Sequence, residues 1–270
     1  MKRLLLTGVA ALAFAVPAVA ADLPARTYKA PPPAIVAAYN WSGFYVGVNG
    51  GYGWGKGDTS YDPLPTPAAF INLAPTDVSL KPKGGLAGGQ IGYNWQVGAF
   101  VGGLEADIQW ADIRSDALVS PIIQNNLTPY GAGSYLATSE KIKWFGTVRG
   151  RVGFTATDTL LLYGTGGLAY GDVEYSANAN FLPVGTVQYP VSFSKTKVGW
   201  VAGAGAEWAF APSWSAKFEY LHYDLGNEST VANPVPVNPP FQVSYGWKTS
   251  GDLVRAGINY RWGGPVIARY

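Results

Sequence analysis

Eight stretches of the chain alternate apolar and other residues with a period of two, the pattern of β-strands that have one apolar face. Most are close in length to the roughly 9–11 residues with which a tilted strand crosses a bilayer. The fifth stretch is so rich in glycine and apolar residues that the pattern does not assign its faces. The stretches are residues 42–55, 84–95, 100–110, 142–154, 160–170, 197–210, 214–223 and 253–262.

In each stretch with assigned faces, every second residue belongs to the apolar face. The charged residues lie at the other positions, on the opposite face. In stretch 100–110, for example, Leu104 and Ile108 share one face while Glu105 and Asp107 share the other. A basic side chain near the middle of a bilayer costs about 2–4 kcal/mol, which explains such segregation if the apolar face contacts lipid. We therefore expect a charge network in the lumen, made of Glu105, Asp107, Lys143, Arg149, Arg151, Glu207, Lys217, Glu219, Arg255 and Arg261.

Large aromatic residues on the apolar parity lie near the ends of the stretches, whereas Val148, Ala204 and Ala256 occupy the middles. A soluble barrel would more often place its bulky aromatics in the middle of the core. The distribution therefore predicts the two aromatic girdles of a membrane barrel. One girdle comprises Trp54, Trp110, Trp144 and Trp200, and the other comprises Trp95, Phe154, Phe210, Trp214 and Trp262.

The connections alternate in length. Long connections (56–83, 111–141, 171–196 and 224–252) alternate with short ones (96–99, 155–159 and 211–213). Long loops face outward and short turns face the periplasm in bacterial outer-membrane barrels. Residues 41–262 are therefore predicted to form an all-β, eight-stranded, antiparallel up-and-down transmembrane β-barrel, with both termini on the periplasmic side.

The two ends of the chain have different compositions from the barrel. Lys2 and Arg3 precede an apolar run and the small-residue site Ala18-Val19-Ala20, which predicts that residues 1–20 are a cleaved signal peptide. The proline-rich residues 21–40 read as a periplasmic leader, and residues 263–270 as a C-terminal tail. Export and strand pattern together predict localisation in the cell outer membrane.

Charge and cysteine content exclude several classes of partner and site. Loss of Lys2 and Arg3 would reduce the 19 basic residues to 17, equal to the 17 acidic ones, so nothing indicates a nucleic-acid partner. The absence of cysteine excludes disulfides and thiolate metal sites. The 13% of charged residues is about half that of an ordinary soluble domain.

No catalytic, metal or cofactor site is expected. The single histidine, His222, shares a face with Asp224, but the sequence places no serine as a nucleophile beside them. A lone histidine with scattered carboxylates also lacks the ligand spacing of a metal site. Residues 50–57 superficially resemble a phosphate-binding loop, but Gly57 stands where serine or threonine is required.

Several segments together resemble the small OmpA-like, porin-like outer-membrane β-barrel proteins of alphaproteobacteria. They are WSGFYVGVNGGYGWG (41–55), GGQIGYNWQ (88–96), GLEADIQW (103–110), VRGRVGF (148–154), LLYGTGGLAYG (161–171), EYLHYDLG (219–226) and VRAGINYRW (254–262). The resemblance implies an eight-stranded envelope protein without enzyme activity, whose surface loops are open to the environment. Trp262 resembles the aromatic end of the last strand that barrel-assembly machinery recognises, and Tyr270 is the competing signal.

An eight-stranded barrel is just wide enough for side chains to fill its interior. We therefore expect Glu105 or Asp107 to pair with Arg149 or Arg151, and the polar lumen to be plugged. The predicted function is a structural protein that contributes to envelope integrity, in contact with outer-membrane lipid and lipopolysaccharide. A narrow porin-like channel for small solutes is one alternative, and an adhesin or ligand-binding protein acting through extracellular loops is another.

Overall fold

The computed structural model describes residues 39–64, 73–74, 76–124, 128–129, 133–180, 187–235 and 242–262. The regular elements in these ranges are β-strands, and none of the described residues forms a helix that could cross a membrane. The long strands are β1 (Gly43–Leu64), β4 (Lys83–Val97), β5 (Phe100–Val119), β8 (Tyr135–Thr157), β9 (Leu160–Asn180), β10 (Gln188–Ala211), β11 (Trp214–Ala232) and β12 (Gln242–Arg261). The short ones are β2 (Leu73–Ala74), β3 (Asp77–Leu80), β6 (Ile123–Gln124) and β7 (Thr128–Pro129).

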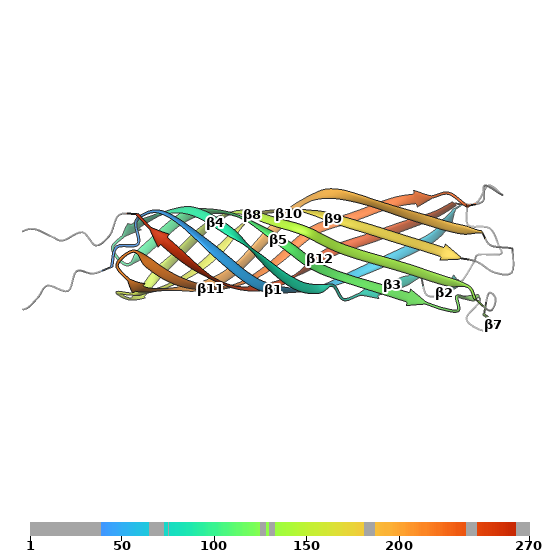
Figure 1. Ribbon diagram of the computed structural model, residues 1–270, viewed down its shortest axis with the longest axis horizontal. Helices are drawn as coiled ribbons and strands as arrows, with labels where there is room; N and C mark the ends of the chain where they lie inside the picture. Colours follow the sequence, from blue (N-terminus) through green and yellow to red (C-terminus); the bar gives the residue numbers. More distant parts are fainter. Residues whose placement is uncertain are drawn as a thin grey trace, which may run out of the picture. The chain divides into compact units, whose positions relative to one another are not determined.

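The eight long strands form a closed antiparallel barrel in which each strand pairs with its neighbours in chain order (Figure 1). The ring closes where β1 pairs with β12, from Tyr45 opposite Arg261 to Leu64 opposite Gln242. A ninth strand, β3, pairs with the far part of β1 beyond the end of the β1–β4 ladder. The predicted eight-stranded up-and-down barrel is therefore confirmed, and closure leaves it without the long open edges of a flat sheet.

The strands are much longer than the sequence pattern predicted. Turns at 98–99, 158–159 and 212–213 confirm the short connections, but most described residues of the predicted long connections belong to strands. At about 3.3 Å per residue and a tilt of about 40°, the 22 residues of β1 rise about 55 Å along the axis. An apolar band in such barrels is about 25 Å tall, so roughly half of the barrel extends beyond it.

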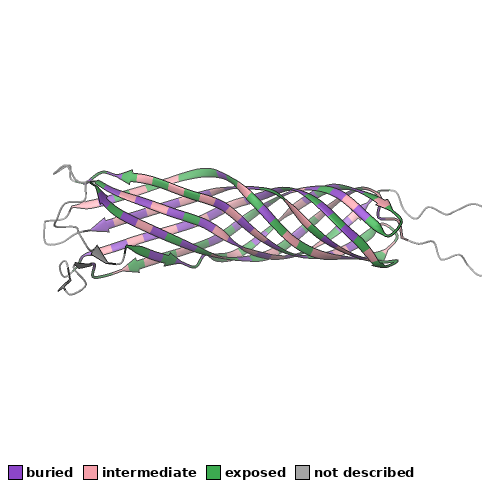
Figure 2. Cartoon of the chain, turned by 180° about the vertical axis from the view of Figure 1, so that it is seen from behind, coloured by how far each residue is buried: buried purple, intermediate pink, exposed green. Residues whose placement is uncertain are grey.

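The half of the barrel next to the short turns carries an apolar belt on its outside. On β5, Phe100, Leu104, Ile108 and Trp110 point outward with exposed fractions of 71%, 58%, 58% and 81%. The nine predicted girdle residues all lie on this outer surface, with Trp144 half-buried and the others exposed. Figure 2 shows how exposed and buried residues alternate along the strands. The belt is the surface that lipid would solvate.

The other half, which we call the outer half, has the opposite arrangement. Beyond Trp54 the outward residues of β1 include Lys56, Asp58 and Asp62, whereas Tyr61 points inward and is 1% exposed. The interior here is a hydrophobic core to which β3, β5, β8, β9 and β12 contribute. Apolar side chains therefore face inward where water surrounds the barrel and outward where lipid does.

Two residues of stretch 142–154 lie on the opposite face from the one predicted. Ile142 was expected outside but is 1% exposed in the core of the outer half, and Lys143 was expected in the lumen but lies outside, 3.1 Å from Glu174. The cause is a register irregularity between Ile142 and Trp144. Because strand side chains alternate, one extra residue reverses the face of everything beyond it.

The faces of β9, which the sequence left unassigned, are resolved. Leu161 and Tyr163 point inward with 0% and 5% exposure, and Leu168 points outward with 59% exposure. Between them, Gly164 faces outward and Gly167 packs against the backbone of β8. The glycines explain why alternation was invisible in this strand.

The outside of a strand faces lipid in the belt and water in the outer half. The destabilisation caused by an introduced charge should therefore depend on its position along the strand. We expect Val148→Arg, in the middle of the belt on β8, to destabilise the protein in lipid vesicles by about 2–4 kcal/mol. Ser139→Arg, which points outward on the same strand in the outer half, should change stability by less than about 0.5 kcal/mol. Equilibrium unfolding by urea measures both, and equal costs would contradict the assignment of the belt.

Candidate functional site

Nine of the ten predicted lumen charges lie inside the barrel, and only Lys143 does not. Their side chains are buried, and they come from strands on opposite sides of the barrel, β5 and β8 facing β10, β11 and β12. We call this set the lumen charge network. It comprises Glu105, Asp107, Arg149, Arg151, Glu207, Lys217, Glu219, Arg255 and Arg261.

Arg149 is at the centre of the network. Its Nη2 bonds Glu105 Oε1 and lies 3.1 Å from Asp107 Oδ2, and its Nη1 lies 3.3 Å from Glu219 Oε1. Glu105 is directly opposite Arg149 in the β5–β8 ladder, so the sheet register places them together. The prediction that an acidic residue of β5 pairs with an arginine of β8 is confirmed.

Arg255 and Lys217 extend the network across the lumen. Arg255 Nη2 donates to Asp107 Oδ2 at 2.8 Å, and its Nε donates to Glu219 Oε2 at 2.7 Å. Lys217 Nζ lies 2.8 Å from both carboxylate oxygens of Glu105. Each of these three carboxylates therefore contacts at least two cations, so the walls of the barrel are tied together through its axis.

A second group of contacts surrounds Glu207, nearer the short turns. Arg151 Nη2 donates to Glu207 Oε2 at 2.6 Å, and Ser215 and Asn259 donate to Oε1 at 2.6 and 2.9 Å. The guanidinium of Arg151 also lies over the ring of Tyr163, 4.3 Å from its centroid. Buried ions are costly unless paired and hydrogen-bonded, and these contacts supply that pairing.

The inner mouth of the barrel is covered by residues that the sequence analysis did not single out. Trp41 is 0% exposed, and its backbone N–H donates to Gln96 Oε1 at 2.7 Å. The guanidinium of Arg261 lies over Trp41 and Tyr39, with centroid distances of 4.9 and 5.4 Å. Cation–π contacts of this kind favour aromatic residues beside a buried arginine. The two aromatic residues just before β1, Tyr39 and Trp41, were the feature of the sequence that could have indicated this cover.

His222 contacts Asp252 and not Asp224, the residue with which it shares a face. It lies on the outside of β11, where its Nδ1 is 2.9 Å from Asp252 Oδ1, and Asp224 instead accepts the backbone N–H of Gly226. The nearby Ser250 hydroxyl bonds the Lys56 carbonyl, not the imidazole. In the described part of the chain no group of three or more His, Cys, Asp or Glu residues could hold a metal ion.

One ionisable group lies alone in the core of the outer half, outside the membrane-spanning part. Glu140 is 1% exposed and accepts a hydrogen bond from Thr249 at 2.6 Å. Burial without a nearby cation raises the pKa of Glu140 to about 7, and the bond from Thr249 opposes this only in part. The sequence pattern could not flag this residue, because it assigned 111–141 to a loop.

Removing Arg149 should be strongly destabilising. Arg149→Ala leaves Glu105, Asp107 and Glu219 with one fewer cation in a buried site, and we expect a loss of about 3–5 kcal/mol. Arg114→Ala, whose side chain is 62% exposed, is the control and should cost at most about 1 kcal/mol. Urea unfolding in lipid vesicles measures the difference, and similar losses would contradict a stabilising network.

Glu140→Gln should have a pH-dependent effect. The folded-state pKa lies above the ordinary value of 4.5, so the contribution of Glu140 is complete below about pH 4.5 and is lost as pH rises through 7. The variant should match the wild type near pH 4.5 and exceed its stability by about 3 kcal/mol above pH 7. Unfolding at both pH values tests this. Exposed Glu174→Gln is the control, and a pH-independent effect of Glu140→Gln would contradict the burial argument.

Comparison with known proteins gives a consistent result. The family model for the outer membrane protein beta-barrel domain matches residues 6–248. The chain is 38% identical over 267 residues to the 31 kDa outer-membrane immunogenic protein of Brucella melitensis biotype 1, covering 97% of this chain and all of that relative. It is 28% identical to the 25 kDa outer-membrane immunogenic protein of the same organism (92% and 98% covered), and 32% identical to a 22 kDa outer membrane protein of Rhizobium leguminosarum bv. viciae (69% and 65% covered). The chain therefore belongs to the outer membrane protein β-barrel family and is a protein of the cell outer membrane.

Proposed function

We propose that the protein is a structural component of the outer membrane that supports envelope integrity, with a lumen closed to solutes. The lumen charge network carries this proposal. Its cations and carboxylates occupy the axis of the membrane-spanning half and contact one another at no more than 3.7 Å. A barrel cross-linked through its interior resists deformation, which is what a load-carrying membrane element requires.

The regions above and below the network support the same proposal. On the outer side, apolar residues that include Phe145, Tyr223 and Leu253 pack into one hydrophobic core. On the inner side, Trp41 packs with Val101 and Leu161. A solute would have to displace three differently packed layers, so a narrow channel is the less favoured alternative.

The outer half favours surface recognition as a second candidate function. Strands that rise about 25–30 Å above the belt would hold the outer connections away from the lipid headgroups. The Brucella relatives are named immunogenic proteins, and by similarity we propose that this chain also presents its outer surface outside the cell. Such a surface could bind an extracellular ligand without any path through the barrel.

A closed lumen predicts that the protein does not conduct ions. Purified protein in planar lipid bilayers should produce no steady single-channel openings, because paired side chains that fill the lumen would block a water-filled path. An Arg149→Ala/Arg255→Ala variant that still folds serves as the comparison and should open more often than the wild type. Reproducible openings of the unmodified protein would overturn the closed lumen and favour the channel.

The structural role predicts an envelope phenotype. A strain that lacks the gene should become more sensitive to detergent, and the wild-type gene should restore resistance. A gene carrying Arg149→Ala, expressed to the same level in the membrane, should restore it less well. Unchanged detergent sensitivity of the deletion strain would contradict a role in integrity while leaving the closed lumen unaffected.

A further inference from the structure

A row of three cations crosses the outside of the barrel on neighbouring strands. Lys83 of β4 is directly opposite Arg114 of β5, and Arg114 is directly opposite Lys141 of β8. Lys83 is exposed, and the side chains of Arg114 and Lys141 are 62% and 40% exposed. Like charges directly opposite each other destabilise a sheet, so this row is unfavourable unless an anion lies against it.

The protein itself compensates only part of this charge. Asp112 lies 3.3 Å from Lys141 and 4.0 Å from Arg114, and Lys83 has no ion pair among the described residues. Lys56 of β1 and Lys81 continue the positive charge beyond Lys83. Carboxylates lie at both ends of the row: Glu174 of β9 is directly opposite Lys141, and Asp252 of β12 is directly opposite Trp54, the neighbour of Lys83 on β1. Around the row, cations outnumber these carboxylates, so this face keeps an excess of positive charge; the cations are Lys56, Lys81, Lys83, Arg114, Lys141 and Lys143, and the carboxylates are Asp112, Glu174 and Asp252.

The cation row lies at the level where lipid headgroups would be. Trp54 is directly opposite Lys83, and Trp110 lies just before Arg114 on β5, so the row begins where the outer aromatic girdle ends. This end of the belt is the one away from the short turns and faces the outer leaflet. Three strands spaced about 4.8 Å apart make the row about 10 Å wide.

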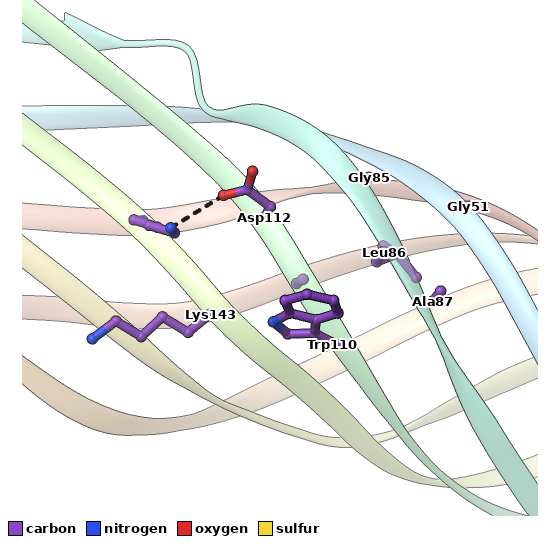
Figure 3. A pocket seen from close by; sticks show the side chains of 9 residues that line it. Gly51, Gly85, Leu86, Ala87, Trp110, Asp112 and Lys143 are labelled. Carbon is purple, nitrogen blue, oxygen red and sulfur yellow. Dashed lines mark ion pairs between the residues drawn. The ribbon is translucent and has the colours of Figure 1, made fainter.

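A groove leads from the row down into the apolar belt. It has a volume of about 700 Å³, and its lining includes Gly85, Ala87, Trp110, Asp112, Lys141 and Lys143 (Figure 3). The dashed line in Figure 3 is the ion pair between Asp112 and Lys141. A Cβ atom added at Gly85 would meet nothing closer than a backbone oxygen at 3.9 Å. The groove is therefore open here because glycine has no side chain to fill it.

The groove continues along the belt. Gly50 and Gly89 also face outward with little around them; Gly50 is directly opposite Ala87, and Gly89 lies two residues further along β4. Trp110 lines the groove with 81% exposure, and the outward Tyr52 and Val48 of β1, 45% and 66% exposed, are directly opposite Gly85 and Gly89. An apolar trough closed by a cationic row at its outer end is complementary to a lipid with an acyl chain and a phosphate headgroup.

We propose that this face of β1, β4, β5 and β8 is a binding site for a phosphorylated, acylated glycolipid of the outer leaflet, the lipid A part of lipopolysaccharide. Phosphate oxygens contact Lys83, Arg114 and Lys141, and an acyl chain lies in the groove over Gly85 and Ala87. The bound anion removes the repulsion within the cation row. The site depends on the position of the barrel in the outer membrane and not on a closed lumen.

Native mass spectrometry of the full-length protein in detergent, titrated with bisphosphorylated lipid A, tests the proposal. Lys83→Gln/Lys141→Gln should weaken binding at least fivefold, because two of three cations are lost. Lys195→Gln/Lys248→Gln removes two lysines away from the groove and should change affinity less than twofold. Gly85→Leu fills the groove without altering charge and should also weaken binding. The heat-dependent shift in electrophoretic mobility checks that each variant is folded.

The lipid can be varied as well as the protein. Dephosphorylated lipid A should bind the wild type at least fivefold more weakly than the bisphosphorylated form. Equal binding of the two lipids would overturn the role of the cation row, and equal binding by both double variants would overturn the site. A shift from dimer to monomer in Lys83→Gln/Lys141→Gln, with unchanged lipid binding, would assign the face to a second copy of the chain and overturn the proposal.

Discussion

The pairing of ionised side chains inside the membrane-spanning half is the interaction on which the structure depends. Lipid excludes charge from the outside of the belt, so the polar residues of each strand must point into a lumen that eight strands make narrow. Confined there, each carboxylate and cation needs a partner, and contacts such as Arg255 with Asp107 and Glu219 provide them. The network is thus a consequence of strand number and solvent together.

The outer half follows from the same rule with water outside. Once the strands leave the belt, the favourable arrangement reverses, and Tyr61, Phe145 and Trp247 turn inward while Lys56 and Asp58 turn outward. One continuous barrel therefore has the side-chain arrangement of a membrane barrel in one half and that of a water-exposed β-barrel in the other. The boundary between them is the outer aromatic girdle, where the cation row also lies. The same boundary fixes where a lipid headgroup could be recognised.

The sequence predicted the belt half well because lipid and lumen impose opposite demands on successive residues. Glu105, Arg149 and Arg255 were placed inside by parity alone, and the structure places them there. Parity failed where one residue is inserted into β8, so Ile142 and Lys143 lie on the opposite faces from those predicted. The alternation also gave a wrong result beyond the outer girdle. There the strands have polar residues on the outside, and the sequence analysis interpreted these segments as loops. Residues 1–38 and 263–270, for which a signal peptide, most of a leader and a tail were predicted, lie outside the described residues.

The most direct test of the closed lumen uses the absence of cysteine from the chain. A single thiol introduced by Thr147→Cys would lie in the charge network, where Thr147 is 0% exposed, and Ser139→Cys provides an outward control on the same strand. In the folded protein, a small charged thiol reagent should modify the control rapidly and the lumen position only after unfolding. Equal rates of modification at both positions would mean that the lumen is filled with water and would contradict the account.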